Sequence, residues 1–134
     1  MEDICIFTPT YNRAHTLSLL FESLVGQNSQ RFYWLVVDDG STDETEALIK
    51  RFSLASPFRV VYVKQENGGK QRAYNTGVEH CESELFFCVD SDDVLVPSAV
   101  ETILNAWEAY RADASVAGLV GLCGRDENTP LGTG

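Results

Sequence analysis

Three times along this 134-residue chain, a short apolar run of the kind that forms a buried strand ends in a polar motif. The motifs are Thr8–Arg13, Asp38–Asp43 and Asp90–Asp93. In an open parallel α/β sheet the carboxyl ends of the strands share one edge, so these motifs are predicted to converge on a single crevice. Their residue types indicate a nucleotide and metal site there.

The rest of the chain alternates between short strand-like runs and helical patterns. The expected strands are Ile4–Thr8, Phe32–Val37, Arg59–Val63 and Leu85–Val89, with a weaker pattern at Val116–Cys123. Apolar residues at helical spacing form three sets: Leu17, Leu20, Phe21 and Leu24; Ala47, Leu48 and Phe52; and Val100, Ile103, Leu104 and Trp107. Arg72–Cys81 is also expected to be helical, and Pro97 suits a first helical turn. This alternation predicts an α/β fold, with a Rossmann-like, mostly parallel sheet and helices on both faces.

Length and composition predict one domain over residues 1–134. A chain of this size with 44% hydrophobic residues can bury a core without disulfides or a structural metal. The four cysteines form no Cys-x-x-Cys pair, which favours reduced, buried thiols. The sequence shows neither a signal-peptide pattern nor an apolar stretch long enough to span a bilayer, so we expect a cytoplasmic location.

The formal net charge of −10 argues against nucleic acid as a partner, because such binding needs clustered Lys and Arg. The acidic excess is partly local, at Asp38, Asp39, Asp43, Glu44 and Glu46 and again at Asp90, Asp92 and Asp93. Clusters of this kind can hold a divalent cation.

The motif Asp90-Ser-Asp-Asp93 follows a run that is apolar enough to be buried. Carboxylates just beyond such a strand can share Mg²⁺ or Mn²⁺ and leave open positions for phosphate oxygens. The simpler interpretation is a solvated loop in which Asp92 or Asp93 caps the next helix. For an isolated motif of this kind the solvated loop would be the favoured interpretation. Because two other polar motifs are expected at the same edge of the sheet, the metal-site interpretation is favoured here.

In the second motif, Ser41 and Glu44 have the spacing of a capping box for the following helix. Capping leaves the adjacent Asp38 and Asp39 unexplained, and a carboxylate at this strand end could accept a hydrogen bond from a base N–H. In the first motif, Tyr11 could stack on a ring and Arg13 could contact a phosphate, with a surface turn as the alternative for Tyr11.

The segment Asn67–Arg72 places two glycines and two cations between a strand and a helix. The glycines permit close approach of the backbone, and Lys70 offers a point charge to a diphosphate. The spacing is not that of a Walker loop and no Gly-x-Gly-x-x-Gly occurs, which weakens ATPase and dinucleotide interpretations. His15 and His80 lack metal-ligand spacing, so neither is assigned a catalytic role.

Together, these motifs resemble the nucleotide-sugar-binding half of family 2 glycosyltransferases with the GT-A fold. The resemblance extends from Ile4 to about Cys123 and is most specific in the three motifs together with Asn67–Lys70 and Ala73–Gly77. It implies that Thr8 and Tyr11 line a base pocket, that Asp39 reads the uracil edge, and that Lys70 and Arg13 lie near the diphosphate.

The same resemblance makes Asp90 and Asp92 an Asp-x-Asp pair. Asp92 would be the more direct ligand of Mn²⁺ or Mg²⁺, while Asp90, with Ser91, would lie nearer the ribose or sugar. Many relatives place an arginine just before the Asn of the segment that corresponds to Ala73–Gly77, where this chain has Tyr74.

The implied activity is metal-dependent, inverting transfer of a sugar from a nucleoside diphosphate sugar, expected to be UDP-linked, to a hydroxyl of a carbohydrate, lipid-linked or protein acceptor. Family members carry the catalytic base in an acceptor-binding region, and Asp126 and Glu127 lie too close to the last expected strand to replace it. We therefore expect the base beyond Gly134, in a longer enzyme whose other parts could place it at the inner face of a membrane.

Two other functions are compatible with parts of the pattern. One is a nucleotide-sugar-binding module without catalysis in a larger protein, which the presence of a base after Gly134 would distinguish. The other is a phosphoryl-transfer or receiver-type domain with clustered Asp and Mg²⁺. The second is disfavoured because it needs an acid after the first strand, where this chain has Thr-Pro-Thr-Tyr.

Overall fold

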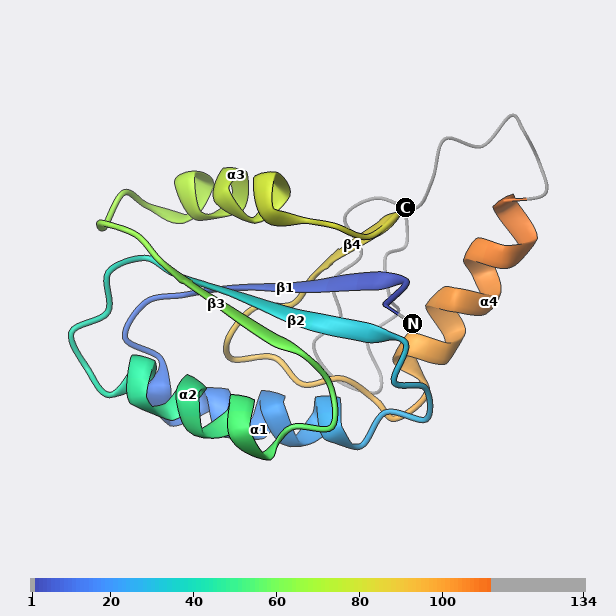
Figure 1. The fold of residues 1–134 in the computed structure, drawn as a ribbon, viewed down its shortest axis with the longest axis horizontal. Helices are drawn as coiled ribbons and strands as arrows, with labels where there is room; N and C mark the ends of the chain where they lie inside the picture. The colour runs from blue at the N-terminus through green and yellow to red at the C-terminus, as the bar shows by residue number, and fades with distance from the viewer. Residues whose placement is uncertain (1, 112–134) are drawn as a thin grey trace.

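The computed structural model describes residues 2–111, in which strands and helices alternate along the chain (Figure 1). The elements are β1 (Ile4–Thr10), α1 (Ala14–Val25), β2 (Phe32–Asp38), α2 (Thr45–Ala55), β3 (Val60–Lys64), α3 (Lys70–His80), β4 (Leu85–Cys88) and α4 (Ala99–Arg111). The strands pair in the order β3-β2-β1-β4, and every pairing is parallel. The predicted α/β fold with a parallel sheet is confirmed.

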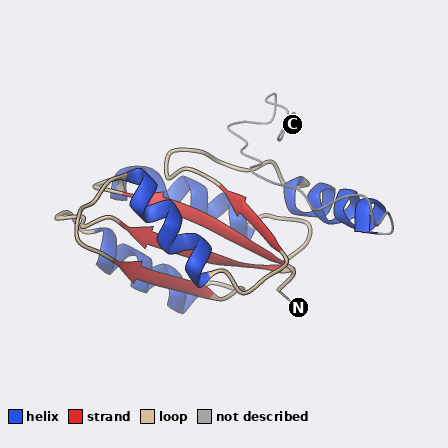
Figure 2. Cartoon of the chain, turned by 90° about the horizontal axis from the view of Figure 1, so that it is seen from above, coloured by secondary structure: helices blue, strands red, loops and turns tan. Residues whose placement is uncertain are grey.

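Helices cover both faces of the sheet. Figure 1 shows α3 on one face and α1 and α2 on the other, with α4 to one side. In Figure 2 the strand arrows all point toward the same edge, where the loops that follow β1, β2 and β4 carry the three motifs. The topology therefore places these loops together, as the motif positions predicted.

The central strands β1 and β2 are buried along their whole length, as is typical of parallel strands covered on both faces. Side chains alternate between two cores. Ile4 and Ile6 of β1 join the core under α1, α2 and α4, whereas Cys5 and Phe7 join the core under α3.

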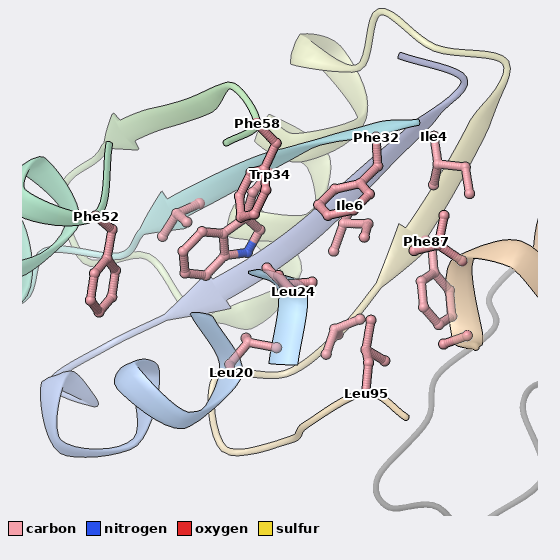
Figure 3. Packing of buried hydrophobic residues seen from close by; sticks show 14 of the residues in the cluster. Ile4, Ile6, Leu20, Leu24, Phe32, Trp34, Phe52, Phe58, Phe87 and Leu95 are labelled. Atoms are coloured by element: carbon pink, nitrogen blue, oxygen red, sulfur yellow. The ribbon is translucent and has the colours of Figure 1, made fainter. Parts of the chain in front are cut away.

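The larger core contains a group of aromatic rings around Trp34 (Figure 3). Phe21 of α1 stacks on Phe52 of α2 with ring centroids 4.2 Å apart, and Trp34 lies 6.2 Å from both rings. The indole Nε1 of Trp34 donates a hydrogen bond to Thr8 Oγ1 at 2.9 Å. This bond satisfies a polar group that would otherwise be costly inside the core.

The smaller core depends on a close approach between α3 and β1. Gly77 of α3 faces the ring of Phe7, which is completely buried, and a Cβ at position 77 would overlap that ring. Tyr74 and Phe86 pack around the same ring. Glycine at position 77 therefore sets how closely α3 lies on the sheet.

Some sequence-based details differ from the structure. The helix expected at Arg72–Cys81 begins two residues earlier, at Lys70, and Pro97 lies two residues before α4. Ala47 is exposed, and Ile49 takes its place on the buried face of α2. The strand expected at Val116–Cys123 lies outside the described residues.

The thiols of Cys5 and Cys81 are free, and Cys123 lies outside the described residues. Burial raises the pKa of Cys5 to about 12, which keeps this thiol protonated at neutral pH. Among the described helices, none combines the length and apolar character needed to cross a membrane.

Gly77→Ala is expected to lower the free energy of unfolding by about 1–3 kcal/mol, because overpacking against Phe7 outweighs the roughly 1 kcal/mol that alanine gains over glycine in a helix. Urea denaturation measures the change. Gly26→Ala is the control, since a Cβ there lies 3.5 Å from the Glu22 carbonyl, an ordinary contact, and its effect should stay within about 0.5 kcal/mol. A gain in stability for Gly77→Ala would contradict the packing described.

Candidate functional site

A cavity of about 320 Å³ lies at the carboxyl edge of the sheet. Its volume is in the range of small-molecule sites. The lining residues come from the three motifs and from the start of α3: Pro9, Thr10, Tyr11, Arg13, Asp39, Lys70, Ala73, Asp90, Ser91 and Asp92. Segments more than 80 residues apart in sequence thus share one concave surface.

Most of the residues singled out from sequence lie in this cavity: Tyr11, Arg13, Asp39, Lys70, Asp90, Ser91 and Asp92. Thr8 does not. It is completely buried inside β1, where its hydroxyl accepts the hydrogen bond from Trp34. The hydroxyl of Thr8 therefore serves the core, and Thr8 is not among the residues that line the cavity.

Thr10, two residues along the same strand, lines the cavity instead. It is 3% exposed, and within the described residues its Oγ1 has no hydrogen-bond partner. Buried polar atoms are normally bonded, so this hydroxyl is a candidate contact for a ligand. Pro9, Thr10 and Ala73 also line the cavity, although the sequence analysis assigned none of them a role in the site. For Pro9 and Thr10, the sequence signal that could have indicated such a role is their position at the end of the first strand.

Asp39 is nearly buried and organises the loop between β3 and α3. Its Oδ1 accepts hydrogen bonds from Gln65 Nε2 at 2.9 Å and from the backbone N–H of Gly68 at 2.8 Å, and its Oδ2 accepts one from the backbone N–H of Gly69 at 2.9 Å. Burial raises the pKa of Asp39, but these donors and Arg72 outweigh that effect and hold it below its ordinary value. The carboxylate is therefore charged at neutral pH.

Gly40, which follows Asp39, has a φ of +85°. A Cβ at this position would lie 2.9 Å from the backbone nitrogen of Asn67. Glycine is thus required both by the backbone conformation and by the approach of the β3–α3 loop.

Asp38 has a different role from its neighbour. It is completely buried, and its carboxylate accepts hydrogen bonds from the backbone N–H of Ser41 and from the Tyr62 hydroxyl. Burial and the hydrogen bond to Asp38 raise the pKa of Tyr62. Asp38 therefore shapes the turn after β2, while Asp39 faces the cavity.

The predicted capping box is wrong. The cap residue of α2 is Glu44, which makes no side-chain cap bond, and the Ser41 hydroxyl instead accepts a hydrogen bond from the backbone N–H of Asn12 at 2.8 Å. Asp43 satisfies the first turn of α2, since its Oδ1 accepts from the backbone N–H of Thr45 at 3.0 Å. The loop geometry turns Ser41 toward the first motif, which spacing alone does not reveal.

The acidic motif after β4 forms a compact cluster. One carboxylate oxygen from each of Asp90, Asp92 and Asp93 lies within 4.8 Å of the others. The helix-capping alternative for Asp92 and Asp93 is wrong, because α4 begins only at Ala99. Three oxygen ligands that converge in this way fit Mg²⁺ or Mn²⁺, which prefer carboxylate and water oxygens.

Lys70 adds a positive charge beside this cluster. It is the first residue of α3, and its Nζ lies 3.2 Å from Asp90 Oδ1. The amino end of α3 thus meets the cavity with both the helix dipole and an ammonium group, an arrangement that suits phosphate. Tyr11, 47% exposed, offers a ring at the same cavity.

Asp39→Asn is expected to lower the free energy of unfolding by about 1–3 kcal/mol at pH 7, since an amide cannot accept all three hydrogen bonds. A carboxyl group whose pKa is lowered by folding contributes stability above its unfolded pKa of about 3.9 and loses it as pH falls through the folded pKa. The difference between the two proteins should therefore vanish between about pH 5 and pH 2, as measured by urea denaturation across pH.

The control for this prediction is Asp3→Asn. Asp3 pairs with Arg31 at the surface, and loss of that pair should cost less than about 1 kcal/mol. If the stability gap of Asp39→Asn persisted at pH 2, hydrogen bonding to the ionised carboxylate would not be its cause.

This chain is similar in sequence to known glycosyltransferases. The profile of “Glycosyl transferase family 2” matches residues 5–132. Glycosyltransferase GlyA of Streptococcus pneumoniae serotype 4 is 34% identical over 115 residues, which is 86% of this chain and 16% of that protein. Chondroitin synthase of Escherichia coli is 34% identical over 114 residues, or 85% of this chain and 16% of that protein.

Two solved structures are similar in fold and sequence. S. aureus TarS 1-349 in complex with UDP-GlcNAc has a TM-score of 0.73 and 26% identity, covering 83% of this chain and 32% of that one. Mannosyltransferase PcManGT from Pyrobaculum calidifontis, in complex with GDP-Man and Mn²⁺, has a TM-score of 0.71 and 26% identity, covering 85% of this chain and 33% of that one. This chain therefore spans no more than a third of these four proteins.

Proposed function

This chain belongs to glycosyl transferase family 2, and on that premise we propose that it binds a UDP-linked sugar in the cavity for metal-dependent, inverting transfer to a hydroxyl acceptor. One observation carries the proposal. Residues from all three motifs and from the start of α3 line one cavity that combines an exposed ring, a buried carboxylate, an ammonium group and a cluster of acids. Those are the groups that a base, a diphosphate and a divalent cation require.

In this proposal Tyr11 stacks on the base and Asp39 accepts a hydrogen bond from a base N–H. A carboxylate has about four acceptor sites, and the described donors to Asp39 occupy three. Asp39 can therefore hold the β3–α3 loop and still read the base. Lys70 and Arg13 supply positive charge to the diphosphate.

Asp90 and Asp92 would hold Mn²⁺ or Mg²⁺, with Ser91 near the ribose or sugar. When bound, the cation offsets the negative charge that develops on the leaving diphosphate. In the reaction, the acceptor oxygen bonds to the anomeric carbon as the bond from that carbon to the diphosphate oxygen breaks. The acceptor proton passes to a base, which we place in the part of the relatives' length that this chain does not span.

The wider assignments belong to the same proposal. The acceptor is a hydroxyl group of unspecified class, on a carbohydrate, a lipid-linked molecule or a protein. We propose a cytoplasmic location, supported by the free thiols of Cys5 and Cys81. Nucleic acid is not a proposed partner because the net charge is −10.

UDP binding is expected to require a divalent cation and Asp92. Titration calorimetry should show UDP affinity falling by at least roughly tenfold when Mn²⁺ is chelated or Asp92 is replaced by Asn, since loss of a metal contact typically costs this much. Asp3→Asn, which removes a half-buried carboxylate outside the cavity lining, should leave the affinity unchanged. Equal UDP affinity with and without Mn²⁺ would show that donor binding needs no metal. Tighter binding of GDP than of UDP would show that the donor nucleotide carries guanine instead of uracil.

Thr10→Val tests the unpartnered hydroxyl in the cavity. Because valine is nearly isosteric and the Thr10 hydroxyl has no partner among the described residues, stability should stay constant or rise. If the hydroxyl contacts the donor, UDP affinity should fall by roughly twofold to tenfold, the effect of one net hydrogen bond. Thr10→Ser should retain affinity, and unchanged affinity in the valine variant would exclude the contact.

A further inference from the structure

Asn12 adopts an unusual backbone conformation between two cavity residues, Tyr11 and Arg13. Its φ is +52°, and it is the one described residue other than glycine with a positive φ. Asparagine tolerates this left-handed region better than most residues, and such conformations persist only where the surroundings hold them. The contacts of Asn12 show what holds it.

Three of the hydrogen bonds that join Asn12 to the second motif involve backbone N–H groups, and a fourth comes from the Thr42 hydroxyl at 3.5 Å. Its backbone N–H donates to Ser41 Oγ at 2.8 Å. Its side-chain Oδ1 accepts from the backbone N–H of Thr42 at 2.8 Å and from that of Asp43 at 3.3 Å. The positive φ lets a single asparagine bond through both its backbone and its side chain to the neighbouring loop.

Asp43 completes the connection in the opposite direction. Its Oδ2 accepts a hydrogen bond from the backbone N–H of Ala14, the first residue of α1, at 3.2 Å. Arg13, at the cap position of α1, makes no side-chain cap bond. The cap is supplied instead by Asp43, which lies 29 positions from Ala14 in the sequence. Burial raises the pKa of Asp43, but the hydrogen bonds from Thr45 and Ala14 outweigh this effect and hold the pKa below its ordinary value. The carboxylate therefore stays charged at the positive end of α1.

We propose that Asn12 and Asp43 are positioning residues that hold the Tyr11–Arg13 segment in its donor-binding conformation. This inference rests on the proposed function. Neither residue lines the cavity, but their bonds fix the backbone between Tyr11 and Arg13 and directly after Arg13. Tyr11 is 47% exposed, so packing alone does not immobilise it. A segment ordered in advance spares the donor the entropic cost of ordering it on binding.

The test compares Asn12→Gly with Asn12→Asp. Glycine keeps the permitted positive φ and removes the side-chain acceptor, whereas aspartate keeps an acceptor at the same position. Asn28→Gly is the matched control, because Asn28 is exposed and lies beyond the opposite end of α1. Two readouts are measured at a temperature where every variant is folded: amide hydrogen exchange of residues 10–17 without ligand, and UDP affinity by calorimetry with Mn²⁺.

In Asn12→Gly, the amide hydrogens of residues 10–17 are expected to exchange faster and UDP to bind about tenfold more weakly. A tenfold loss of affinity corresponds to the contribution of roughly one net hydrogen bond, here one that orders the site. Asn12→Asp should restore both values toward wild type, and Asn28→Gly should change neither. Unchanged exchange in Asn12→Gly, or faster exchange with unchanged UDP affinity, would overturn the inference.

Asp43→Asn provides an independent variant, since it removes the charge at the start of α1 and keeps one acceptor oxygen. It should accelerate exchange over residues 14–17 and weaken UDP binding in the same direction as Asn12→Gly. If the wild-type protein binds neither UDP nor GDP, the proposed function fails. The exchange measurements then decide alone whether Asn12 and Asp43 order this segment.

Discussion

The site depends above all on the parallel pairing of β1 with β2. In this register Thr10 lies opposite Asp38, and the backbone N–H of Asp39 donates to the Thr10 carbonyl at 2.9 Å. Because side chains alternate along a strand, a slip of one residue would exchange the inward and cavity-facing side chains of both motifs. The register is secured by cores on both faces of β1, with Ile6 on one side and Phe7 on the other.

Beyond this strand pair, the loops around the cavity are held together by hydrogen bonds of polar side chains rather than by apolar packing. Asp39 holds the β3–α3 loop through the backbone of Gly68 and Gly69, and this loop leads directly to Lys70 beside the acidic cluster. On the other side, the Thr16 hydroxyl donates to the Ser91 carbonyl at 2.8 Å, so the first turn of α1 contacts the acidic motif as well. A carboxylate bonded to backbone N–H groups orders a polar loop that has no apolar residues to bury.

Sequence reasoning predicted the convergence of the motifs because convergence follows from topology: each motif comes after a parallel strand. It misjudged the features that depend on local geometry. Thr8 and Thr10 look equivalent in sequence, yet the indole of Trp34 binds Thr8 inside the core, while Thr10 reaches the cavity. Likewise, the spacing of Ser41 suited a helix cap, but the left-handed Asn12 brings another backbone N–H to its hydroxyl. Contacts between distant segments decided both cases.

Under the proposed function, the charge arrangement at the cavity would couple the binding of the donor to that of the cation. Three carboxylates that approach within 4.8 Å repel one another, and the exposed Lys70 offsets only part of that repulsion because solvent screens its pairing with Asp90. A divalent cation relieves the repulsion, and together with Lys70 it brings the formal charge of the cluster to zero. A diphosphate then meets a cation with positions for its oxygens instead of three uncompensated carboxylates, so each of the two ligands makes the site more favourable for the other. Binding of cation and donor should therefore be thermodynamically coupled, and by reciprocity the donor strengthens cation binding by the same factor as the cation strengthens donor binding.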